Sequence, residues 1–186
     1  VLFMPARFAH LHLHSEYSLA DSTIRIPELV KRCAALGLPA VAVTDRNNLF
    51  SLVKFYRAAE GAGIKPIAGA DVLIAEGDEA PSRLTLLCRD HDGYLALSRL
   101  LTRAWMEGQR HDGVVLRPHW LKENNGGSAV KGLFALSGRL AQAGQLAEGG
   151  RHDLAEGVLA DLQRTFDDRL HLEITRAGLE GETAYN

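Results

Sequence analysis

Short apolar runs alternate with helix-like patterns along most of the chain. The strand-like runs cover residues 7–13, 39–44, 64–74, 84–88, 132–137 and 170–174. The segments with apolar residues at helical spacing are 27–36, 48–60, 93–106, 139–147 and 153–166. Residues 108–130 read as a long loop with a short helix near Trp120. This alternation is typical of a parallel sheet or a β/α barrel, so we expect an α/β fold.

Each predicted helix has an apolar stripe that should face the core. In the first three helices the stripes are Leu29, Val30, Cys33 and Leu36; Leu49, Leu52, Val53 and Tyr56; and Leu97, Leu100, Leu101, Ala104 and Trp105. Pro27 suits a first helical turn, and Gly37 suits a helix end. Pro66 and Gly69 interrupt the run 64–74, so this strand should be bent or bulged.

Three histidines alternate near the start of the chain, at His10, His12 and His14. In a strand, successive side chains point to opposite faces, so the imidazoles should share one face while Leu11 and Leu13 point into a core. Imidazole is the commonest metal ligand, and two of them about 7 Å apart on one face can share an ion. The alternative is a polar strand face whose histidines bond neighbouring carbonyls or carboxylates.

Four carboxylates lie at or near predicted strand ends: Asp21, Asp45, Asp71 and Glu173. Functional residues of β/α folds gather where strands end and loops begin. Alone, Asp21 or Asp45 is best explained as a loop cap. Together with the histidines, the carboxylates favour a site for Zn²⁺, Mn²⁺ or Fe²⁺ over the all-oxygen cage of Ca²⁺. The sequence contains no GxSxG, Walker, GxGxxG or HExxH motif.

Composition narrows the class of protein further. The 186 residues are 46 % apolar and carry a net charge of −2, which gives no electrostatic reason to bind nucleic acid unaided. No apolar run approaches the ~20 residues that span a bilayer, so we expect no membrane partner. Residues 1–6 read as a flexible leader rather than a signal peptide. Cys33 and Cys88 fit small buried hydrophobes in a reducing compartment, so we expect a cytoplasmic protein.

Several segments together resemble one known family. They are His12-Leu-His14 with Asp21, Thr44-Asp45 with Asn48, Gly63-Ile-Lys-Pro-Ile-Ala-Gly-Ala-Asp71, and Leu172-Glu173-Ile174. The chain resembles the PHP domain (polymerase and histidinol phosphatase), and more narrowly the PHP domain at the N-terminus of the alpha subunit of bacterial replicative DNA polymerase III. The resemblance covers nearly the whole chain, so residues 1–186 are interpreted as one PHP domain.

The resemblance implies a distorted β/α (TIM-like) barrel built around up to three metal ions, cut short here before its last strands. Active members of the family hydrolyse phosphoesters. By position, the family's metal ligands correspond to His12, His14, Asp21, Asp45 and Asp71. The sequence identifies no catalytic residue.

The departures from the family pattern are as informative as the matches. Arg46, Arg83 and Ala177 stand where the family has ligand histidines. Arginine is always protonated and cannot bind a cation. We therefore expect Arg46 and Arg83 to pair with the predicted aspartates and to replace the charge of a metal cluster. The alternative is that both arginines are solvated surface residues.

The resemblance leaves two functions open. In the first, the chain is a structural and partner-binding domain of a replicase. Its partners would be the rest of the polymerase alpha subunit, the proofreading exonuclease subunit and, through the parent DNA-directed DNA polymerase, DNA. In the second, the chain is an active metal-dependent phosphoesterase, either a 3′–5′ exonuclease or a pyrophosphatase. The replaced ligands favour the first. At most one divalent ion (zinc, manganese or magnesium) would remain, held weakly by His12, His14 and Asp71.

Overall fold

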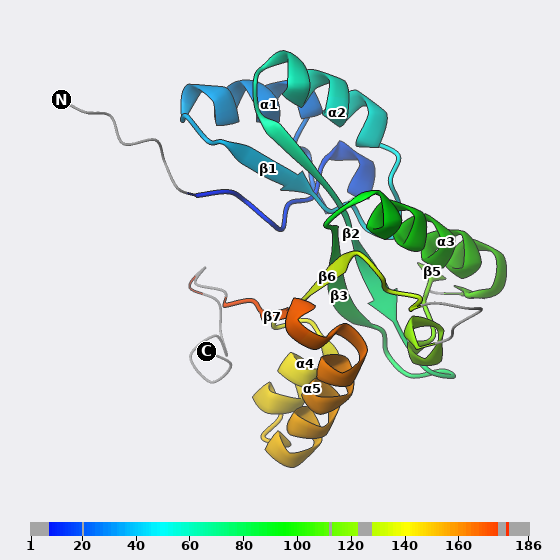
Figure 1. Ribbon diagram of the computed structural model, residues 1–186. Helices are drawn as coiled ribbons and strands as arrows, with labels where there is room; N and C mark the ends of the chain where they lie inside the picture. Colours follow the sequence, from blue (N-terminus) through cyan, green and yellow to red (C-terminus); the bar gives the residue numbers. More distant parts are fainter. Residues whose placement is uncertain (1–7, 20, 112, 123–127, 175–177, 179–186) are drawn as a thin grey trace. The chain divides into compact units, whose positions relative to one another are not determined.

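The structure is a computed structural model that describes residues 8–19, 21–111, 113–122, 128–174 and 178. The chain forms two compact units, Val1–Ala70 and Asp71–Asn186. The boundary falls inside one strand, β2 (Lys65–Ile74), which therefore contributes residues to both units. Figure 1 shows the elements of each unit along the chain. The predicted leader, residues 1–6, lies outside the described residues.

The first unit consists of two helices beside a parallel strand pair. Its elements in chain order are η1 (Glu16–Ser18), α1 (Ile26–Ala35), β1 (Ala40–Val43), α2 (Leu52–Gly61) and the start of β2. Strand β1 pairs in parallel with β2, from Ala40 opposite Lys65 to Val43 opposite Ala68. Helices α1 and α2 contact each other and lie side by side in Figure 1.

Helix α1 forms where the sequence predicts it. Pro27 lies in its first turn, and the chain leaves the helix through Gly37, whose φ of +66° suits a residue without Cβ. The predicted stripe is buried at Leu29, Val30 and Cys33, where it packs on β1 and α2 residues in one apolar cluster. Burial raises the pKa of the Cys33 thiol, as expected for a cysteine that serves as a small hydrophobe.

Helix α2 is shorter than predicted, and its buried face is different. It begins at Leu52 rather than at residue 48, and its fully buried residues are Phe55 and Ala59. Val53 and Tyr56 of the predicted stripe are 64 % and 47 % exposed. Phe55 and Ala59 are also at helical spacing, and the Phe55 ring, unlike that of Tyr56, has no hydroxyl that needs a partner in the core.

The predicted strand over residues 7–13 is reduced to one bridge. His10 pairs in parallel with Val41, and the described residues around it have no regular strand. Leu13 packs partly against the core, whereas Leu11 is 42 % exposed instead of buried. The reason is local. The side chains of Thr44 and Asp45, directly after β1, accept hydrogen bonds from the amides of Leu13 and Ser15 in place of a regular strand ladder.

The second unit contains most of the sheet. Its elements are the rest of β2, β3 (Ser82–Cys88), α3 (His91–Glu107), β4 (Gln109–Arg110), β5 (Gly113–Val114), η2 (Pro118–Leu121), β6 (Leu133–Ser137), α4 (Gln142–Glu148), α5 (His152–Phe166), η3 (Asp167–Arg169) and β7 (Leu170–Leu172). The strand order is β2-β3-β6-β7, and β4 pairs only with β5. Helix α3 packs on β3 and β6, and α4 packs along α5.

The parallel pairing that the alternation suggested holds for only part of the sheet in this unit. Strand β3 pairs antiparallel with β6, whereas β6 pairs in parallel with β7. The connection from β3 to β6 contains α3, the β4–β5 hairpin and η2. After this connection, β6 runs in the direction opposite to β3. The chain is therefore α/β with a mixed sheet.

The two tryptophans differ in burial, and Trp105 does not lie in the core as predicted. Trp105, placed on the apolar stripe of α3, is 45 % exposed, whereas Trp120 of η2 is 2 % exposed. Arg103 and Arg117 lie over the Trp120 ring, with their guanidinium carbons 4.4 and 5.5 Å from its centroid. The ring thus packs in the core while its faces meet two cations. Among the described residues, no helix has the length and apolar character needed to cross a bilayer.

Candidate metal centre

The histidine segment runs beside β1, bound to it at two points. The amide of Ala42 donates to the carbonyl of His10 at 2.8 Å, and the amide of Thr44 donates to the carbonyl of Leu13 at 2.8 Å. The Thr44 hydroxyl also accepts from the Leu13 amide at 2.9 Å. These bonds fix the backbone on both sides of His12 without forming a regular strand.

His12 and His14 bring their rings together in the first unit. The ring centroids are 5.6 Å apart, and one nitrogen of each ring lies within 4.8 Å of one of the other. His14 also places Nδ1 3.5 Å from Oδ2 of Asp21. Two imidazoles whose ring nitrogens lie this close together are donors that suit Zn²⁺ or Mn²⁺.

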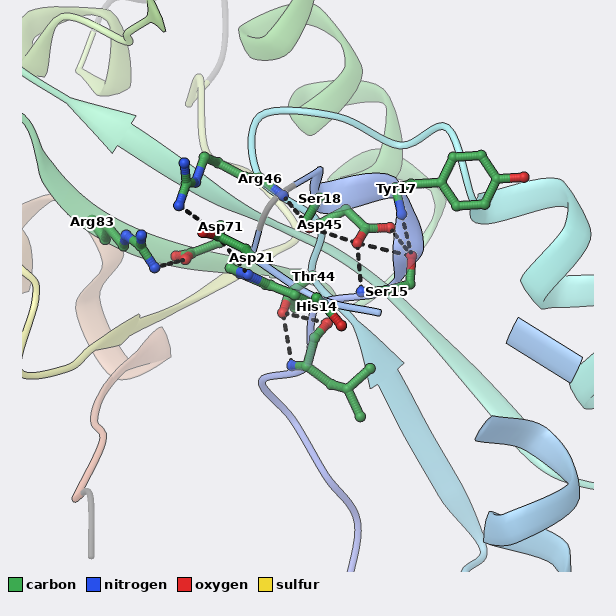
Figure 2. Close-up of polar contacts among 12 residues, drawn as sticks. His14, Ser15, Tyr17, Ser18, Asp21, Thr44, Asp45, Arg46, Asp71 and Arg83 are labelled. Atoms are coloured by element: carbon green, nitrogen blue, oxygen red, sulfur yellow. Dashed lines mark hydrogen bonds and ion pairs between the residues drawn. The ribbon is translucent and has the colours of Figure 1, made fainter. Parts of the chain in front are cut away.

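Arg46 already places a positive charge on this carboxylate. Its Nη2 forms an ion pair with Oδ2 of Asp21, the oxygen that faces His14 (Figure 2). The Arg46 and Asp21 side chains are 32 % and 24 % exposed, so the pair lies near solvent. The Nε atom of Arg46 is buried and has no hydrogen-bond partner among the described residues. The expected pairing of Arg46 with an aspartate is confirmed.

Asp45 is surrounded by neutral donors. It is 1 % exposed, and its oxygens accept from the Ser15 amide at 2.7 Å and from the hydroxyls of Ser18 and Ser51, each at 2.7 Å. The Ser15 hydroxyl also donates, 2.8 and 2.9 Å from the two oxygens. Asp45 therefore joins three segments: the loop after the histidines, the end of β1 and the start of α2. Its predicted role as a metal ligand stays a prediction.

Asp71 lies in the second unit, where Arg83 and Thr85 of β3 reach it. Asp71 is fully buried, and its Oδ1 accepts a 3.0 Å hydrogen bond from the Thr85 hydroxyl. Arg83 places Nη1 3.7 Å from Oδ2, and its side chain is 29 % exposed (Figure 2). The expected pairing of Arg83 with an aspartate is confirmed. Ala177 lies outside the described residues.

Sequence reasoning did not find the hydroxyl donors. Ser15, Ser18 and Ser51 around Asp45, and Thr85 beside Asp71, have no motif spacing that singles them out. One signal was available: two of the serines follow the histidines within four residues, in a loop predicted to end at a carboxylate. Buried carboxylates need donors, so small hydroxyl residues near Asp45 were candidates.

Comparison with known proteins identifies the family. A family model described as "PHP domain" matches residues 10–177. The chain is 55 % identical over 194 residues to DNA polymerase III subunit alpha of Xylella fastidiosa (strain Temecula1), which covers 96 % of the chain and 16 % of the relative. It is 44 % identical over 176 residues to the subunit of the same name from Pseudomonas aeruginosa, covering 93 % of the chain and 15 % of the relative.

The subunit of the same name from Escherichia coli (strain K12) is 41 % identical over 183 residues, covering 96 % of the chain and 15 % of the relative. The chain thus spans about one sixth of the length of the curated relatives it matches. With the family model extending over most of its residues, the chain belongs to the PHP domain family.

Proposed function

We propose that the chain is the N-terminal PHP domain of a replicative DNA polymerase alpha subunit and that its main role there is structural and partner-binding. The high identity to DNA polymerase III subunit alpha across nearly all of the chain supports the placement in a replicase. The parent protein would be a cytoplasmic DNA-directed DNA polymerase, a nucleotidyltransferase. Its polymerase active site would lie in another domain.

The observation that carries the structural role is the pairing of both arginines with aspartates. Arg46 pairs with Asp21, and Arg83 pairs with Asp71. In each pair a fixed positive charge lies on a carboxylate that the family resemblance assigns to a metal. A guanidinium held there neutralises the carboxylate and opposes the approach of a metal cation. A complete cluster of three ions therefore should not form.

One divalent ion, zinc, manganese or magnesium, fits the remaining donors. His12 and His14 would hold it, and the family resemblance adds Asp71 as a third ligand, which stays a prediction. When bound, such an ion would polarise a phosphoester or activate a water. The His12–His14 pair is the observation that favours the second candidate function, a metal-dependent phosphoesterase with 3′–5′ exonuclease or pyrophosphatase activity.

The overall architecture belongs to the same proposal. We infer a distorted TIM-like barrel from the alternation of strands and helices and from the parallel pairs β1–β2 and β6–β7. The proposed partners are the remainder of the polymerase alpha subunit and the proofreading exonuclease subunit of the replicase. DNA would be met through the parent protein.

Hydrolysis assays decide between the two functions. We expect the purified chain to cleave neither single-stranded DNA nor a generic phosphodiester or pyrophosphate at a useful rate, with Mn²⁺ or Zn²⁺ supplied. The same preparation of His14→Ala serves as the control for a contaminating nuclease. Turnover by the parent chain that disappears in His14→Ala would establish phosphoesterase activity and would contradict a mainly structural role.

Metal content and partner binding supply the second test. Elemental analysis after dialysis should give no more than one transition-metal ion per chain. Gel filtration of the chain with the proofreading exonuclease subunit from the same organism should show co-elution. Three ions per chain would contradict the replacement of metal charge by Arg46 and Arg83, and separate elution would contradict exonuclease docking.

A further inference from the structure

Glu173 is a charged residue that the predicted ligand set does not use. Its amide donates to the carbonyl of Ser137 at 3.1 Å, directly after β7. Its side chain leans over Gly138, because a Cβ atom on Gly138 would lie 2.5 Å from Oε2 of Glu173. The three atoms nearest to that Cβ position all belong to Glu173. The carboxylate therefore reaches from β7 across the end of β6, into space that a side chain at residue 138 would fill.

Strand register places this carboxylate on the face that carries Arg83. Three residues oppose one another across neighbouring strands and so share a face: Thr85, Leu136 and His171. Because β3 runs antiparallel to β6, Arg83 lies two residues before Thr85, whereas Gly138 and Glu173 lie two residues after Leu136 and His171. Side chains two residues apart in a strand point to the same face, so Arg83, Gly138 and Glu173 share it. The Arg83 amide also donates to the carbonyl of Leu140 at 2.7 Å, so the chain just beyond Gly138 stays beside Arg83.

We propose that Arg83 is held between two carboxylates, Asp71 from β2 and Glu173 from the end of β7, across the gap left by Gly138. Strands β3 and β7 are two positions apart in the sheet, about 10 Å between backbones. An extended arginine and a glutamate that leans toward it can cover this distance. The neighbouring cation Arg139 is already paired with Glu148.

In this arrangement, the Arg83 guanidinium connects several strands of the sheet. In the second unit, one guanidinium joins side chains from strands β2, β3 and β7 on a single face of the sheet. A metal ion that shares ligands from several strands would connect them in the same way. The inference rests on the proposed structural role of the chain. It adds Glu173 as a second carboxylate for Arg83, and Gly138 as the residue whose missing side chain leaves space for the Glu173 carboxylate.

A double-mutant cycle on the purified chain tests the pair. Arg83→Met keeps an unbranched apolar stem and removes the guanidinium, and Glu173→Gln keeps the side-chain length and removes the charge. We expect each to lower the melting temperature by about 3 °C or more, and the double variant to lose clearly less than the sum of the two. Arg83→Lys, which keeps the charge, should recover part of the loss. Additive losses, or Arg83→Lys no better than Arg83→Met, would overturn the proposal.

The glycine supplies an independent test. Gly138→Ala should lower the melting temperature in the parent but much less in a Glu173→Ala background, where the carboxylate that meets the new Cβ is gone. Gly157→Ala is the matched control, because Gly157 lies in α5 with open space around its Cβ position and should not destabilise. An equal loss from Gly138→Ala in both backgrounds would contradict the placement of Glu173. Hydrolytic activity of the parent would contradict the proposed function and leave these melting results unchanged.

Discussion

The two units contain the same substitution, an arginine in place of an expected ligand histidine, in two different environments. In the first unit, the side chains of Arg46 and Asp21 are 32 % and 24 % exposed, so both charged groups are partly accessible to solvent. In the second unit, Arg83 is similarly accessible at 29 %, but Asp71 is fully buried. The burial of the carboxylate, more than that of the arginine, therefore distinguishes the pairs.

The difference follows from where each aspartate lies in the chain. Asp21 follows a loop and has Arg46 and His14 as neighbours. Asp71 lies inside β2 between Ala70 and Val72, which are fully buried. A carboxylate in such a place has lost its water and needs donors from the protein, among them Thr85 and Arg83. The same replacement is thus expected to be nearly neutral in one unit and important for stability in the other.

Asp45 offers the largest expected effect, since it is a buried carboxylate stabilised without an arginine. Asp45→Ala would leave the hydroxyls of Ser15, Ser18 and Ser51 without their acceptor. We expect a loss of about 3–5 kcal/mol in the free energy of unfolding, measured by urea denaturation. The exposed Asp78→Ala is the control and should change little. A small loss at Asp45 would mean that neutral donors do not hold this region together.

Arg83→Ala should come next in size. It removes the paired cation from the buried Asp71 carboxylate, which keeps its hydrogen bond from Thr85, and we expect a loss of about 2–4 kcal/mol in the free energy of unfolding. The partial exposure of Arg83 keeps the value below that of a fully buried pair. Arg99→Ala, an exposed position on α3, serves as the control in the same denaturation series. If both variants unfold alike, burial of the carboxylate is not what separates the two units.

Arg83→His sharpens the comparison through metal binding. The change places an imidazole where the family resemblance implies a ligand histidine, beside the Asp71 carboxylate. We expect Zn²⁺ affinity to rise by about tenfold or more over the parent, measured by calorimetry, together with lower stability when metal is chelated. Arg83→Gln removes the charge without adding a strong ligand and should show no such rise. Equal affinities in the two variants would place residue 83 outside any metal position.

Sequence patterns predicted the elements with strong periodicity and missed those set by single side chains. Helix α1 and the strands β1, β2, β3 and β6 lie close to their predicted ranges, because an apolar stripe marks the helix and a short apolar run marks each strand. Helix α2 has two sets of apolar residues at helical spacing. The set of Phe55 and Ala59 is buried, whereas Val53 and Tyr56 of the predicted stripe are exposed. The β4–β5 hairpin was missed, since two residues in each strand carry no period.

The candidate site was predictable in its charges but not in its donors. The pairs of Arg46 and Arg83 with aspartates could be expected, because opposite charges at matched motif positions tend to meet. Ser15 and Ser18 lie about 30 residues before Asp45 and reach it only in the fold, whereas Ser51 follows it by six residues. Glu173 was seen as a carboxylate in the last strand, but its contact with Gly138 depends on strand register, which periodicity does not give.

Arg46→Ala should give the smallest effect and so completes the comparison. The pair it breaks is partly exposed on both sides, and exposed pairs contribute less than about 1 kcal/mol. Salt screens such charges, so the small loss seen at low ionic strength should shrink further at 0.5 M NaCl, whereas the loss from Arg83→Ala should change less because Asp71 is buried. Parallel denaturation series at two salt concentrations measure both. A large loss of unfolding free energy from Arg46→Ala that does not change with salt would contradict this expectation. It would show that the first unit depends on its arginine as much as the second does, and that solvent exposure does not predict how much an ion pair contributes to stability.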